Sequence, residues 1–150
     1  MTLRDALLIL HIAGVGTWLG ANVVQAFVPP LAARSGTETL GWWYRTSAVM
    51  SSRLYMPAAI LILVTGIFLV LQNDSYGFGS TFVTIGFGMI VVGAVLGMVV
   101  FGPSGDAAAD AAESGDEPGL IRSAGRIARY GLIDTLLLLF TITVMVLKLG

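Results

Sequence analysis

The sequence contains no cysteine and only one histidine, His11. The absence of cysteine excludes disulfides, thiolate metal sites and cysteine nucleophiles, and it leaves the redox compartment of the protein undetermined. A single imidazole also excludes a metal site built from several histidines of one chain. No set of catalytic residues stands out, so the sequence does not indicate an enzyme.

Charged residues are scarce as well. Only 11% of the residues are charged, against roughly 25% in soluble domains, while 56% are hydrophobic. The net charge is −1 and there is no long basic run, so binding to nucleic acid has no electrostatic basis. Because a soluble domain of this composition would have too little polar surface, the composition predicts a protein that resides in a lipid bilayer.

Four apolar stretches approach or exceed the length of about 20 residues that a transmembrane helix needs. They cover residues 6–28, 55–71, 81–101 and 131–147. Pro29 and Pro30 are expected to end the first stretch, since proline interrupts a helix. A secretory signal peptide fits this stretch poorly, because its apolar region would span only about 7–15 residues. The sequence therefore predicts a single all-α integral membrane domain, a bundle of four transmembrane helices.

The connections between these stretches differ in composition. Residues 103–119 are acidic and small, which is typical of a flexible, solvated loop. Residues 30–54 hold three arginines together with Trp42 and Trp43, whose rings are expected to anchor this segment at the lipid headgroups. The acidic segment is followed by Arg122, Arg126 and Arg129. Lys and Arg favour the inner side of a membrane, so the connections 30–54 and 103–130 are expected in the cytoplasm and both termini outside.

Gly93 and Gly97 form a GxxxG pattern in the third stretch. Small residues at this spacing let two membrane helices approach closely. The pattern predicts a tight crossing, either within the bundle or between two copies. We expect a homo-oligomer or a membrane partner on this basis.

Polar residues recur along one face of the first stretch: His11, Trp18, Asn22 and Gln25. With a rise of 1.5 Å per residue, His11 lies roughly 7 Å inside the outer boundary, whereas Asp134 lies near the inner end of the fourth stretch. The two side chains are then about 15–20 Å apart along the membrane normal, too far for a direct acid–base pair. The sequence thus predicts an outer site and an inner site.

The outer site centres on His11. A neutral imidazole can bind haem iron or a transition metal such as copper, and Met145, expected at a similar depth, would be a thioether partner. Gly14 and Gly16 would let a flat macrocycle or another backbone approach. Two alternatives stay open, a hydrogen-bonded structural role for His11 and a role in proton relay.

The inner site combines Asn22, Gln25, Arg53 and Asp134. A carboxylate within an apolar span is costly unless it is paired, so one interpretation is a structural network of ion pairs and amides. The other is a path for a proton, an ion or a small solute.

Several of these residues also carry a family resemblance. The run LHIAGVGTWLGAN at residues 10–22, Pro57 with Thr65 and Gly66, and the ending from Asp134 to Lys148 resemble the copper-resistance-protein-D-like membrane domains of bacteria and archaea. They are also similar to related uncharacterised families of small four-span integral membrane proteins. The resemblance implies a helical bundle in a prokaryotic plasma membrane, with copper or haem bound through His11. The single histidine and the lack of a methionine cluster depart from the pattern of a copper transporter.

Three functions follow as hypotheses. The first is a small membrane bundle that binds haem or a metal through His11. The second is a transporter subunit for a proton, an ion or a small solute that uses Asn22, Gln25 and Asp134. The third is a membrane scaffold without chemistry of its own.

Overall fold

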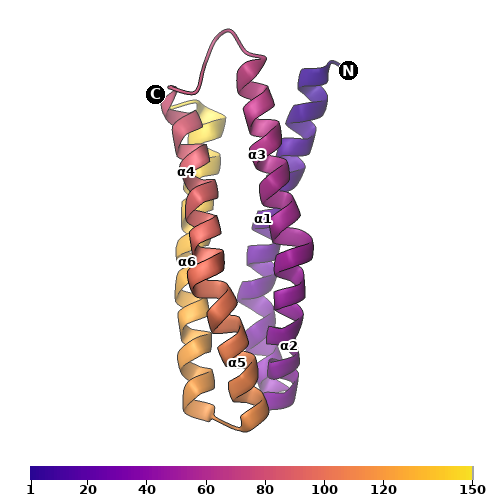
Figure 1. Ribbon diagram of the computed structural model, residues 1–150, viewed down its shortest axis with the longest axis vertical. Coiled ribbons are helices and arrows are strands. Elements are labelled where there is room, and N and C mark those ends of the chain that lie inside the picture. The colour runs from indigo at the N-terminus through magenta and orange to yellow at the C-terminus, as the bar shows by residue number, and fades with distance from the viewer. Residues whose placement is uncertain (150) are drawn as a thin grey trace.

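Four helical rods stand side by side and run alternately down and up in the computed structural model, which describes residues 1–149 (Figure 1). The elements are α1 (Leu3–Arg34), α2 (Thr37–Met50), η1 (Ser51–Tyr55), α3 (Met56–Leu71), α4 (Thr81–Leu96), η2 (Gly97–Phe101), α5 (Gly102–Ser114) and α6 (Glu117–Leu147). Here η1 and η2 are short π-helical segments that continue their rods without a break. Both termini and the connection 72–80 lie at one end, called the terminal end, and the tight turns after α1 and α5 lie at the other, the turn end.

The predicted fold class is confirmed. Each rod is long and apolar enough to cross a membrane, and the described residues contain no strand. Large apolar side chains cover the outside of the rods, among them Phe68 of α3 and Phe140 of α6. In a bilayer this apolar outer surface faces lipid, so the chain is a multi-pass membrane protein.

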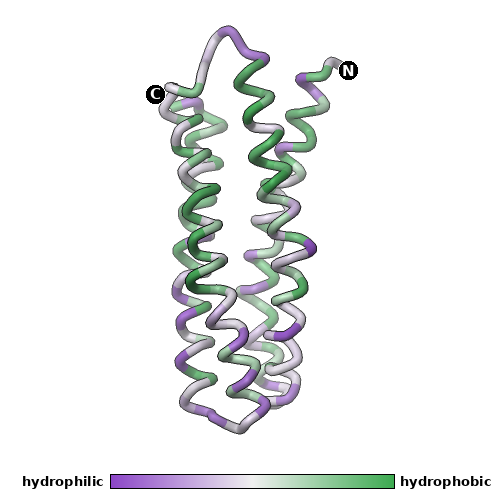
Figure 2. Tube along the Cα trace, viewed as in Figure 1, coloured by the Kyte–Doolittle hydropathy of each residue, from purple (hydrophilic) through white to green (hydrophobic). Residues whose placement is uncertain are grey.

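The rods are longer than a bilayer is thick. They contain 31 to 35 residues and are therefore about 47–53 Å long, against a hydrocarbon core of about 30 Å. Apolar residues concentrate toward the terminal end and polar residues toward the turn end (Figure 2). The turn end is thus a helical extension beyond the apolar part of the bundle.

The prediction of a flexible loop over residues 103–119 is wrong. Gly102–Ser114 forms helix α5, and α6 begins at Glu117. Pro103 follows η2 inside a continuous rod, so its missing N–H leaves the carbonyl of Val99 without a helical donor, and the alanines that follow have the highest helix propensity. Gly115 ends the helix with a left-handed φ of 74°.

The first connection is also more ordered than predicted. Helix α1 continues through Pro29 and Pro30 to Arg34, and α2 begins at Thr37. Ala32, which follows the two prolines, is buried in the apolar core of the turn end. Burial of this segment offsets the local cost of two prolines in a helix.

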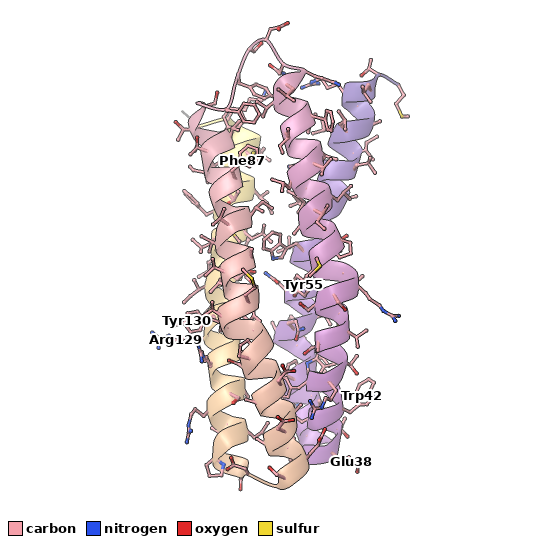
Figure 3. All side chains as sticks on the ribbon, in the orientation of Figure 1. Glu38, Trp42, Tyr55, Phe87, Arg129 and Tyr130 are labelled. Carbon is pink, nitrogen blue, oxygen red and sulfur yellow. The ribbon has the colours of Figure 1, made fainter. Side chains whose placement is uncertain are left out.

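The turn end has its own core, in which aromatic residues of α2 pack against small residues of α5. Trp43 and Tyr44 are buried against Ala108 and Ala109, whose exposed fractions are 0% and 1%. The expected role of Trp43 as a headgroup anchor is therefore wrong, whereas its neighbour Trp42 is exposed, as Figure 3 shows. Small side chains on α5 let α2 approach closely, and this contact joins the two halves of the chain.

An ion-pair cluster on the surface reinforces this contact. Arg45 of α2 donates to Asp110 at 2.5 Å and to Glu113 at 3.0 Å, both on α5. The hydrogen bonds from Arg45 lower the pKa of Glu113, and the two carboxylates raise the pKa of Arg45. All three side chains are largely exposed, so this cluster adds specificity more than stability.

The chain forms two helical hairpins, one from α1 to α3 and one from α4 to α6, and the contacts between them are uneven along the bundle. Helix α1 packs along α3, and α6 packs along α4 and α5. At the turn end α2 and α5 pack closely, whereas α3 and α4 scarcely touch and stand apart near the terminal end (Figure 1). Beyond the turn end, the two hairpins meet mainly where α1 contacts α6.

Candidate functional site

A buried carboxylate lies in the middle of the bundle, where the two hairpins meet. Asp134 of α6 is 2% exposed. Its Oδ2 accepts hydrogen bonds from Nε1 of Trp18 at 3.1 Å and from Nδ2 of Asn22 at 2.7 Å, both on α1. Trp18 and Asn22 are four residues apart and therefore lie on one face of the helix, one turn from each other.

A third element completes this group. Tyr55, the last residue of η1, donates its hydroxyl to Oδ1 of Asn22 at 3.0 Å. Figure 3 labels Tyr55 near the mid-height of the bundle. We name Trp18, Asn22, Tyr55 and Asp134 the carboxylate network. It connects three of the four rods.

The fourth rod contributes space rather than a polar group. A Cβ atom on Gly93 of α4 would collide with the six-membered ring of Trp18. Gly93 therefore leaves room for the indole that reaches Asp134, so it packs within the bundle against a side chain. Gly97, in η2, has nothing within 4 Å of its Cβ position, and a crossing between two copies at Gly97 stays a prediction.

The charge balance of the carboxylate network is unusual. Both donors to Asp134 are neutral, and no arginine, lysine or histidine of the described chain forms an ion pair with it. Its second oxygen, Oδ1, is buried and has no hydrogen-bond partner in residues 1–149. An ionised carboxylate in an apolar medium is costly without a compensating charge, and the residues that the structure describes place no cationic side chain against Asp134.

The structure joins only part of the predicted inner site. Asn22 and Asp134 are in contact, as the sequence suggested. Arg53 is exposed on η1 and takes no part in the network, and the half-buried Gln25 makes no side-chain hydrogen bond among the described residues. The predicted ion pair with Arg53 is replaced by neutral donors, because a long arginine side chain at a membrane boundary extends toward water.

Two members of the carboxylate network were not predicted as polar partners. Trp18 lies on the polar face that the sequence indicated but was assigned to neither site; it packs in the core, and its indole nitrogen also donates to Asp134. Tyr55 was not singled out. A π-helical segment holds more residues per turn than an α-helix, so it changes which side chains face the bundle. An unpaired Asp within an apolar span is the signal that could have prompted a search for both donors.

His11 lies nearer the terminal end, about 10 Å along α1 from Trp18. Its Nδ1 lies 3.0 Å from the hydroxyl of Thr65 on α3, and that hydroxyl donates to the carbonyl of Leu61. Because that hydroxyl donates its proton to Leu61, it accepts from Nδ1–H, which makes Nε2 the acceptor nitrogen of the imidazole. Gly66 makes room for the ring, since a Cβ there would lie 3.3 Å from Cε1 of His11.

The other residues of the predicted outer site have separate neighbours. Met145 packs against Gly86 of α4, whereas the polar contact of His11 is with Thr65. Gly14 faces Ile62 of α3, where a Cβ would lie 2.8 Å from Cγ1, so it serves helix packing, and only Gly16 faces open space.

The fit of a metal or haem at His11 is therefore limited to one ligand atom per chain. Nε2 can bind a metal, but no group of three His, Cys, Asp or Glu residues exists among residues 1–149. Binding of haem or copper through His11 stays a prediction.

No protein-family model, curated protein or solved structure matches this chain. The fold and the site by themselves define its class. It is a four-helix membrane protein with a buried carboxylate held by neutral donors between its two hairpins.

Proposed function

We propose that the protein is a proton-coupled membrane subunit in which Asp134 binds and releases a proton. One observation carries the proposal: Oδ1 of Asp134 is buried without a partner, while the other oxygen accepts only from neutral donors. A proton on Oδ1 removes the charge without disturbing the bonds from Trp18 and Asn22. A metal cation would need several oxygen ligands, which a single carboxylate does not provide.

The depth of the site supports this function. Trp18 and Asp134 lie about 18–20 Å from the ends of their apolar stretches at the terminal end, inside a hydrocarbon core of about 30 Å. Ionisable groups at such a depth are typical of proton relays in pumps and transporters. Because α3 and α4 scarcely touch, a change in their spacing around Asp134 would break few contacts.

Infrared spectroscopy of the protein in liposomes tests the proposal. We expect the C=O band of protonated carboxylic acids, to which the exposed acids also contribute at low pH, to contain a component that Asp134→Asn lacks. Asp106→Asn, which removes an exposed carboxylate of α5, is the matched control and should keep that component. Proton flux driven by a potassium diffusion potential should fall at least about tenfold in Asp134→Asn alone, as expected when a relay group is lost. A band and a flux that Asp134→Asn leaves unchanged would refute the function.

The proposed orientation places the turn end in the cytoplasm of a prokaryotic cell. The terminal end carries only Arg4, Lys148 and the α-amino group. The other arginines lie in the half of the bundle nearer the turn end: Arg34, Arg45, Arg53, Arg122, Arg126 and Arg129. Positive residues near the ends of transmembrane helices are retained in the cytoplasm.

Single cysteines test this orientation cleanly, because the chain has none of its own. A membrane-impermeant maleimide should label Asp74→Cys in intact cells. It should label Glu117→Cys, at the turn end, only after the cells are made permeable. The opposite labelling pattern would reverse the orientation.

A further inference from the structure

Three arginine side chains are exposed at one level of the bundle. Arg53 belongs to η1, and Arg126 and Arg129 belong to α6. Arg53 and Arg129 each lie about 18 residues, or about 27 Å, from the last residue of their rod at the terminal end, and Arg126 lies about 32 Å from it. Arg53 is far in sequence from Arg126 and Arg129 and lies on the other hairpin, but all three have nearly the same depth.

That depth matches the thickness of a membrane. The hydrocarbon core is about 30 Å thick, so an apolar stretch that begins at the terminal end leaves the core at this level. On the terminal side of the arginines, exposed positions are apolar, such as Met56 and Ile60 of α3 and Leu132 of α6. On the other side begins the polar extension shown in Figure 2.

The positive charge at this level is not neutralised by the protein. Asp110 and Glu113 of α5 pair with Arg45, and neither Arg53 nor Arg129 forms an ion pair within residues 1–149. Arg126 donates only a long hydrogen bond of 3.4 Å to the carbonyl of Val99. Arg129 and the adjacent Tyr130 are labelled in Figure 3 at one side of the bundle, near its middle. The guanidinium groups thus remain available for another anion.

We propose that Arg53, Arg126 and Arg129, the arginine collar, bind the phosphate groups of anionic phospholipids in one leaflet. A planar guanidinium matches a phosphate through two parallel hydrogen bonds, and a net positive collar favours a headgroup with net negative charge. The bound headgroups fix the depth of the bundle, so that the extension of α2 and α5 stays in water. Each arginine is expected to strengthen binding on the order of fivefold.

Native mass spectrometry of the protein released from nanodiscs tests the collar. The nanodiscs contain phosphatidylcholine with a minor share of phosphatidylglycerol. The wild-type protein should retain phosphatidylglycerol in preference to phosphatidylcholine, and the triple variant R53Q/R126Q/R129Q should bind it at least about tenfold more weakly. The variant R4Q/R34Q/K148Q removes the same charge outside the collar and should bind like the wild type.

A competition with inorganic phosphate and a pair of single-arginine variants complete the test. Inorganic phosphate in excess should not displace the lipid, since the acyl chains hold the headgroup against the apolar surface. If the triple variant does not fold, R53Q and R129Q singly should each lower retention on the order of fivefold. Equal retention by the collar and control variants, or displacement by inorganic phosphate, would overturn the proposal.

Discussion

Replacing Gly93 by leucine is expected to destabilise the bundle by about 3 kcal/mol. Already the first added atom, Cβ, would overlap the indole of Trp18, and that ring is held in place by its bond to Asp134. The larger side chain must either displace the indole or separate α4 from α1. Unfolding in detergent micelles, followed by circular dichroism, measures the loss.

The control for this variant lies on the same helix. Gly88 is exposed on α4 and has nothing within 4 Å of its Cβ position. Gly88→Leu should leave stability unchanged or raise it by about 0.5–1 kcal/mol, because glycine is a poor helix former. Trp18→Ala should rescue Gly93→Leu in part, since it removes the ring that the leucine strikes. Equal stability of the two leucine variants would show that Gly93 does not hold the space for Trp18.

Replacing Asn22 by leucine is expected to cost about 2–4 kcal/mol. The side chain of Asn22 donates to Asp134 and accepts from Tyr55, so its loss leaves the buried carboxylate and the half-buried hydroxyl each short of a partner. The same unfolding measurement records this effect.

A second substitution separates lost packing from the unpaired carboxylate. In the background of Asn22→Leu, Asp134→Leu removes the acid that has lost one of its two donors, and it should recover at least about 1 kcal/mol. In the wild-type background the same change should not stabilise the protein, because Asn22 and Trp18 would then lose their acceptor. If Asp134→Leu has the same effect in both backgrounds, the two side chains are not coupled.

The apolar pattern predicted the membrane bundle because lipid leaves the backbone few choices. Without water, every N–H and C=O must be bonded within its own segment, so an apolar stretch of sufficient length becomes a helix whatever its neighbours are. The face shared by Trp18 and Asn22 was equally predictable, since it depends only on helical periodicity. The rise per residue further separated His11 from Asp134 by depth.

The structure of the turn end could not be predicted from local composition. The acidic segment around Asp110 has a composition typical of a loop, yet it is helical because its alanines pack against Trp43 and Tyr44. This contact joins residues far apart in the chain, and a local pattern does not contain it. Tertiary packing therefore decided the structure of the segment against its composition.

The sequence by itself determined that the chain crosses a membrane as four helices and that Asp134 needs a partner inside it. Both conclusions follow from the cost of polar groups in lipid, which depends on each segment alone. Only the tertiary structure decided that this partner is neutral. The arrangement of α1, η1 and α6 brings Trp18, Asn22 and Tyr55 together with Asp134, and Arg53 remains outside on the surface. Depth can be counted along a chain, but which side chains meet at a given depth depends on how the helices are rotated and packed.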